Sequence, residues 1–124
     1  MAVTYTTAVK NARLDAVTTA IGTTGVLEIC SAAYAAVLAT IALNNPAAAG
    51  ASGGVLTLSG FPKSDTNADD SGTAAVARIR TAGGGTDIIT GLTVGTSGSD
   101  INLDSLSITA GQTVTINSAT ITHA

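Results

Sequence analysis

The apolar positions of the chain change their spacing at Gly22. Before that glycine, the segment TAVKNARLDAVTTAIG carries apolar residues at helical intervals, which predicts one helix over 7–22. Thr6 or Thr7 is placed to cap its start, and Gly22 is suited to end it in a left-handed conformation. The apolar stripe consists of Val9, Leu14, Ala16, Val17, Ala20 and Ile21. We expect this stripe to face the core.

From residue 25 onward the spacing becomes two, which predicts seven to nine short strands. The predicted strands cover 25–30, 35–43, 55–60, 73–81, 86–90, 91–95 and 100–103, with further alternation around 106–108 and 114–121. Small apolar residues fall on both faces of the 35–43 strand, so we expect it to be covered on both sides. The stretches 44–54 and 61–72 are rich in Gly, Asn, Ser and Asp and predict loops.

Two local patterns refine the strand prediction. The turn at 82–85 joins 73–81 to 86–90 and predicts a hairpin, with Arg78 and Arg80 on the face opposite Ala77 and Ile79. Near the C-terminus, the apolar parity slips by one residue at Asn117-Ser118. A β-bulge produces such a slip, and a turn at the same place is the alternative.

These elements predict a mainly β fold, namely an antiparallel β-sandwich or jelly-roll-like domain with one N-terminal α-helix. Residues 1–6 are expected to form an N-terminal arm, and residues 7–124 a single β-rich domain. The chain shows neither alternating strands and helices nor a repeat of fixed period, so we expect neither a parallel sheet nor a solenoid.

Composition adds a constraint on the surface. Only 10% of the 124 residues are charged, against about 25% in an average soluble domain. The mean hydropathy is +0.44, and aromatics are 2% of the chain, Tyr5, Tyr34 and Phe61. No stretch is apolar enough to span a bilayer. We therefore expect part of the exterior to be covered by copies of the chain or by another protein.

The net charge and the N-terminal residues limit the classes of partner and the compartment that we expect. The net charge of −3 argues against nucleic acid, because such binding needs clustered basic residues. The first residues, MAVTYTTAVKNARLDAV, do not have the pattern of a signal peptide, so we expect the chain to be made in the cytoplasm of its host. We expect no membrane association.

Candidate chemistry is sparse. Cys30 follows an aliphatic run and is interpreted as a small core residue, and His123, the only histidine, lies next to the C-terminus. The segment Asp65–Asp70 is similar to the start of a calcium loop, but Asp70 replaces the required glycine and Val76 the bidentate glutamate. Its acidic side chains either bind calcium or cap local turns. We expect no enzymatic activity, no cofactor, no metal and no small-molecule substrate.

Four residues are candidates for subunit contacts: Tyr5, Arg13, Arg78 and Arg80. Tyr5 lies in the expected arm, which is expected to order on a neighbour. Arg13 either keeps its charge in water or reaches a carboxylate of a neighbouring subunit. Arg78 and Arg80 either guard a strand edge in solvent or meet acidic groups across an interface.

Two stretches of the sequence carry a resemblance to a known group of proteins: TYTTAVKNARLDAVTTAIG followed by GVLEICSA, and the C-terminal GLTVGTSGSDINLDSLSITAGQTVTINSATITH. In these stretches the chain resembles small virion proteins of tailed bacteriophages. Within that group it is most similar to head decoration (cement) proteins. The resemblance implies a structural protein on the capsid surface of the virion, a homotrimer that clamps neighbouring major capsid protein subunits. A tail, baseplate or fibre protein is the first alternative, and a β-sandwich that binds carbohydrate or calcium is the second.

Overall fold

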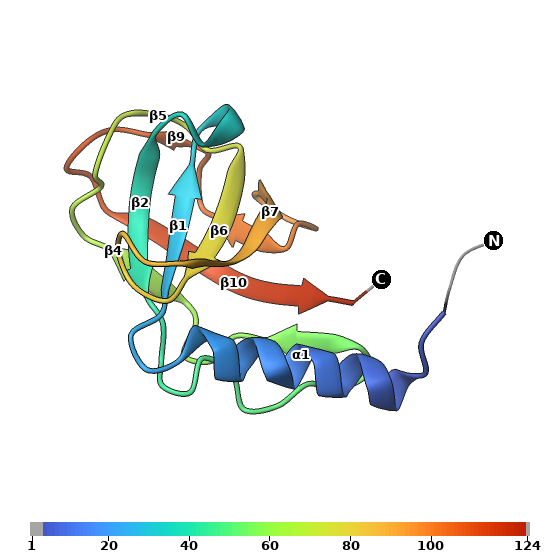
Figure 1. The fold of residues 1–124 in the computed structure, drawn as a ribbon. Coiled ribbons are helices and arrows are strands. Elements are labelled where there is room, and N and C mark those ends of the chain that lie inside the picture. The colour runs from blue at the N-terminus through green and yellow to red at the C-terminus, as the bar shows by residue number, and fades with distance from the viewer. Residues whose placement is uncertain (1–3, 124) are drawn as a thin grey trace.

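The computed structural model describes residues 4–123 and has one α-helix followed by strands (Figure 1). The helix is α1 (Thr7–Ile21), and a short 3-10 helix, η1 (Ala32–Tyr34), follows the first strand. The strands are β1 (Val26–Cys30), β2 (Val37–Ala42), β3 (Val55–Thr57), β4 (Lys63–Asp65), β5 (Gly72–Thr73), β6 (Val76–Arg80), β7 (Asp87–Gly95), β8 (Ile101–Leu103), β9 (Ser107–Ile108) and β10 (Val114–Thr122). The prediction of a mainly β fold with one N-terminal helix is confirmed.

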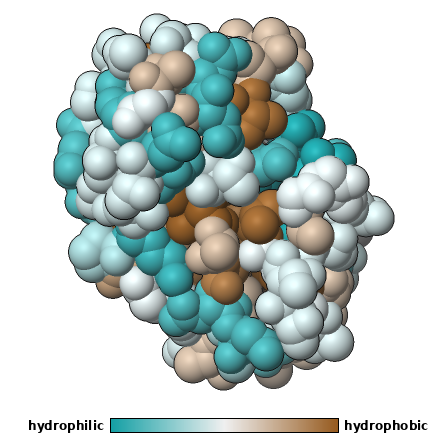
Figure 2. Space-filling view, turned by 90° about the vertical axis from the view of Figure 1, so that its left-hand side faces the viewer, coloured by the Kyte–Doolittle hydropathy of each residue, from teal (hydrophilic) through white to brown (hydrophobic). Residues whose placement is uncertain are grey.

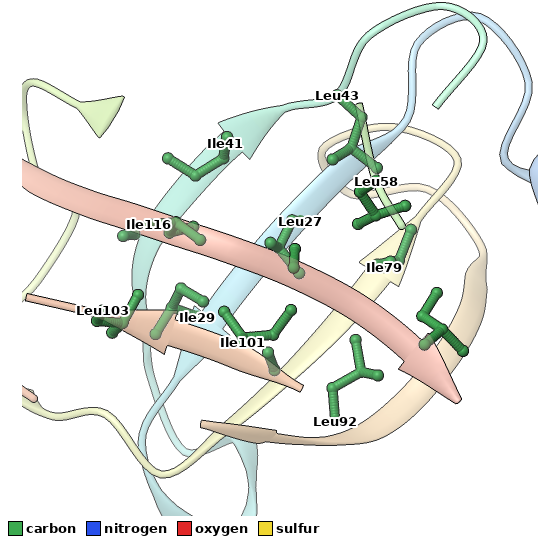
Figure 3. Close-up of a cluster of buried hydrophobic side chains, with 14 of the residues drawn as sticks. Leu27, Ile29, Ile41, Leu43, Leu58, Ile79, Leu92, Ile101, Leu103 and Ile116 are labelled. Atoms are coloured by element: carbon green, nitrogen blue, oxygen red, sulfur yellow. The ribbon is translucent and has the colours of Figure 1, made fainter. Parts of the chain in front are cut away.

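The strands form one curled, mixed sheet and one small ribbon. The main sheet has the order β2-β1-β6-β7-β8-β10-β3, with β4 also paired to β10, and β5 pairs with β9. All pairs are antiparallel except β7 with β8, where the expected antiparallel arrangement is wrong. Because the sheet curls, β10 crosses over β1, β2 and β6, which gives the two layers of a sandwich-like fold (Figures 1 and 3).

The helix begins and ends where the sequence predicts, but it presents a different face to the core. The Thr6 Oγ1 accepts a hydrogen bond from the Val9 N–H at 3.4 Å, and Gly22 follows the last turn with a φ of 75°. Leu14 and Ile21 are buried, and Val17 is half-buried. The expected placement of Val9, Ala16 and Ala20 in the core is wrong, because all three are exposed.

The strand boundaries differ from the prediction in the loops. The hairpin of β6 and β7 forms as expected, and a register shift in β10 between Ile116 and Ser118 confirms the predicted bulge. The two segments expected at 86–90 and 91–95 are one strand, β7, whose register to β6 shifts twice. The expected loop 61–72 contains β4, because its residues pair with β10.

The core is built from aliphatic side chains, as the low aromatic content requires. Leu27 and Ile29 of β1 and Ile79 of β6 face Ile101 and Ile116 from the opposite layer, and all five are fully buried (Figure 3). Each such side chain contributes about 1.5–3 kcal/mol on burial. In β2, Leu38 and Ala39 are both fully buried but Ala42 is exposed, so the expectation of a strand covered on both sides is confirmed only for its first part.

Candidate interaction surfaces

A charged network lies on the outer face of β1, β6 and β7. Glu28 and Arg78 are register partners on β1 and β6, and Arg78 Nε donates to Glu28 Oε1 at 2.6 Å. Arg80 Nη1 lies 3.7 Å from the same oxygen. Arg80 Nε lies 2.8 Å from Asp87 Oδ1, an ion pair that is not aligned for a hydrogen bond. Two arginines and two carboxylates therefore balance within the chain.

Tyr34 extends this network toward β7. Its ring lies under the Arg78 guanidinium, 5.3 Å from ring centroid to Cζ, and its hydroxyl accepts a hydrogen bond from the Gly91 N–H at 2.6 Å. To reach this position, Ala33 and Tyr34 both adopt positive φ angles of 57° and 58°. Non-glycine residues in that region carry strain of about 1–3 kcal/mol each, which these contacts offset. Tyr34 therefore fixes the bulged part of β7 against the arginine pair.

Glu28 and Cys30 are buried although they lie on this outer face. Glu28 is 5% exposed and Cys30 0%. The Glu28 hydrogen bond raises the pKa of the Arg78 guanidinium above its usual range. Burial raises the pKa of the Cys30 thiol, although the nearby Arg78 works in the opposite direction. The interpretation of Cys30 as a core residue is confirmed, and its thiol is neutral near pH 7.

The structure changes the interpretation of Arg78 and Arg80. The edge-guarding role is wrong, because β6 pairs with β1 on one side and β7 on the other. The acidic groups that these arginines meet belong to their own chain, Glu28 and Asp87. Sequence reasoning missed Glu28 and Tyr34. The available signal for Glu28 was one carboxylate inside an otherwise apolar strand.

The second surface is the outward face of α1. Its residues are Ala8, Val9, Ala12, Ala16, Thr19 and Ala20, all of them exposed, and we call it the exposed face of α1. It lies opposite Leu14, Val17 and Ile21, which pack on the sheet. Tyr5, at 41% exposure, and Val9, at 43%, are the exposed large hydrophobic residues of the described part of the chain. Both lie at the N-terminal end of this helix.

Tyr5 and Arg13, two of the predicted contact residues, lie together at one border of the exposed face. The Arg13 guanidinium stacks over the Tyr5 ring, 4.5 Å from its centroid. The Tyr5 ring also meets the edge of His123, with ring centroids 5.7 Å apart. The C-terminal part of the expected arm is thus in contact with the domain through Tyr5, and residues 1–3 lie outside the described part. Arg78 and Arg80, the other two predicted contact residues, lie in the charged network on the outer face of β1, β6 and β7.

The inner side of α1 is attached to the loop before β3. The Asn11 Oδ1 accepts from the Gly54 N–H at 2.9 Å, and the Asp15 Oδ1 accepts from the Ala51 N–H at 2.8 Å. His123 N–H donates to the Gly54 carbonyl oxygen at 2.9 Å. These bonds hold the helix, the loop and the end of β10 together, so the exposed face has a fixed orientation.

The Asp65–Asp70 segment covers the free edge of β2. Asp65 Oδ2 accepts from the Thr40 N–H at 3.0 Å, and its Oδ1 from the Asn67 N–H at 3.0 Å. Asp69 Oδ2 accepts from the Thr40 hydroxyl at 2.7 Å, and Asp70 Oδ1 from the Ser71 N–H at 2.8 Å. The carboxylates thus bind N–H and O–H groups of the chain, as the turn-capping interpretation predicts. This edge is shielded from other strands.

The same use of carboxylates extends through the whole chain. Each of its eight acidic side chains accepts a hydrogen bond or pairs with arginine. They are Asp15, Glu28, Asp65, Asp69, Asp70, Asp87, Asp100 and Asp104. Of the basic side chains, Arg13, Lys63, Arg78 and Arg80 also have partners within the chain. The few charges are engaged internally, so few remain for solvent alone.

One face of the molecule has an apolar area within a mostly hydrophilic and neutral surface. Figure 2 shows apolar residues gathered in a hollow in the middle of one face, with hydrophilic residues at its border. Within residues 4–123 there is no pocket for a small molecule and no group of three or more metal-binding side chains. In the same part of the chain, no helix is long and apolar enough to cross a membrane. The described surface is therefore suited to contact over a broad area with another macromolecule.

The chain matches no family model, no curated protein and no solved structure.

Proposed function

We propose that the protein is a structural component of a phage virion, a decoration protein that binds the outside of the head and clamps neighbouring capsid subunits. The observation that carries this proposal is the internal use of the charges. Eight acidic side chains and four of five basic ones are engaged within the chain, and an apolar helix face is left outside. Such an exterior favours contact with other proteins over contact with water alone.

The mechanism of such a clamp is the sum of many weak contacts. Apolar and backbone contacts of modest strength, repeated at every equivalent position of a symmetric shell, give a stable particle although each one is weak. We propose that the chain also associates with itself, as a homotrimer over a junction between capsid subunits. This role requires no catalytic residue and no cofactor.

The test is the copy number of the chain in purified virus particles. Quantitative mass spectrometry of particles from a lysate that produces the chain compares it with the major capsid protein. A decoration protein is expected at an abundance close to that of the shell subunit. A much lower abundance would contradict a decoration role and indicate a tail or baseplate protein instead. Complete absence from particles would overturn the virion role.

A further inference from the structure

We infer that the exposed face of α1 is a contact between copies of this chain, in which the helices of neighbouring copies lie parallel to each other. This deepens the self-association that the proposed function includes. The occupant of the face is a second copy, and its orientation follows from the two charges that border the face.

The first observation is the shape and polarity of the face. Ala8, Ala12, Ala16 and Ala20 recur every fourth residue along the 15-residue helix, Val9 adds the one large apolar side chain, and Thr19 adds one hydroxyl. Residues four apart lie above one another on a helix, so these positions form a continuous surface about 20 Å long. Side chains this small let two helix backbones approach to the short end of the usual 8–10 Å range.

The second observation is the position of the charges. Arg13 and Asp15 are the charged residues that border the face, and two residues correspond to about 200° around a helix, so they lie on opposite sides of it. When two helices pack in parallel about a rotation axis, the Arg13 side of one copy meets the Asp15 side of the next. When they pack antiparallel, like sides meet and place Arg13 near Arg13. Charge complementarity therefore selects the parallel arrangement.

The third observation is that both charges are already held in place. The Arg13 guanidinium stacks on Tyr5, and Asp15 is fixed by the Ala51 N–H through one oxygen. A side chain that is ordered before association loses less entropy when a partner binds. The stacking uses the face of the guanidinium and the Ala51 bond uses Oδ1, so the N–H edge of Arg13 and the second oxygen of Asp15 are the parts that a partner would contact.

Cysteine cross-linking tests the orientation. Ala8→Cys and Ala20→Cys are made separately in the full chain and oxidised with diamide, because the native Cys30 is fully buried. In the parallel arrangement each variant forms a disulfide-linked dimer with itself. In an antiparallel arrangement equal positions would be about 18 Å apart, and neither variant would link to itself. Thr96→Cys, on the exposed loop between β7 and β8, is the matched control and is expected to stay unlinked.

Sedimentation equilibrium tests the contact itself. Ala12→Glu places a charge in the middle of the face and is expected to weaken self-association by at least about tenfold, while Thr96→Glu leaves it unchanged. Circular dichroism confirms that both variants fold. A wild-type chain that is monomeric at all concentrations, or that links no better than the Thr96→Cys control, overturns the inference. These measurements use the isolated chain, so they are independent of whether it occurs in virus particles.

Discussion

At the scale of single residues, the most informative side chain is Glu28. It is a 5% exposed carboxylate that accepts from Arg78 and lies near Arg80, so with Asp87 it balances the two arginines on one sheet face. A buried ion pair adds little stability compared with apolar residues, but the loss of one partner leaves an uncompensated charge. The network therefore fixes the register of β1 against β6.

Replacement of Glu28 tests this role. Glu28→Gln is expected to lower the free energy of unfolding by about 2 kcal/mol, because Arg78 loses its charged partner in a largely buried position. The measurement is urea unfolding followed by circular dichroism. Asp87→Asn is the matched control, because the Asp87 side chain is 44% exposed and its loss is expected to cost less than about 1 kcal/mol. Equal effects of the two variants would contradict the account.

Cys30 predicts a pH dependence with a definite sign. Burial raises its pKa above the ordinary 9.0, so above about pH 9 the unfolded chain loses the thiol proton while the folded chain retains it. The thiol's contribution to stability is present below that pH and is lost as the pH rises. We expect the wild type to lose more stability between pH 8 and 10 than Cys30→Ala, by up to about 1.4 kcal/mol per pH unit. The measurement is the melting temperature across this range, and parallel curves would contradict it.

At the scale of elements, the sequence predicts where elements lie better than which surfaces they present. The bounds of α1 are signalled by Thr6 and Gly22, and the β10 bulge by the parity slip at Asn117-Ser118. The buried side of α1 is not signalled, because alanine fits both the core and solvent, and the four alanines of the helix lie with Val9 on its exposed side. Glu28 and Arg78 are 50 residues apart and meet only through strand pairing, which no local pattern contains.

The shielded edge of β2 gives a prediction at this scale. Asp65→Ala removes the acceptor of the Thr40 N–H and of the Asn67 N–H, so it is expected to lower stability by about 1–2 kcal/mol. Hydrogen exchange should show faster exchange of the Thr40 amide. Asp70→Ala is the control, because Asp70 accepts only from the adjacent Ser71 N–H in this segment. Unchanged exchange at Thr40 in Asp65→Ala would show that the edge is protected by something else.

At the scale of the whole molecule, the shortage of charge and the internal use of charge have one consequence. The carboxylates cap turns, shield an edge and neutralise arginines, so the few charges of the chain stabilise the fold as well as meeting solvent. The resulting surface has an apolar helix face on one side and an apolar hollow on another (Figure 2). A surface of this kind is suited to a chain that works in contact with protein neighbours.

The most direct measurement is the binding of the purified chain to capsids from particles that lack it. The two are mixed at increasing chain concentration, the capsids are sedimented, and the bound chain is quantified against the major capsid protein. We expect saturable binding at a fixed ratio close to the number of capsid subunits, with a higher temperature of capsid disruption. A chain that remains in the supernatant at every concentration, and leaves the disruption temperature unchanged, would contradict the account.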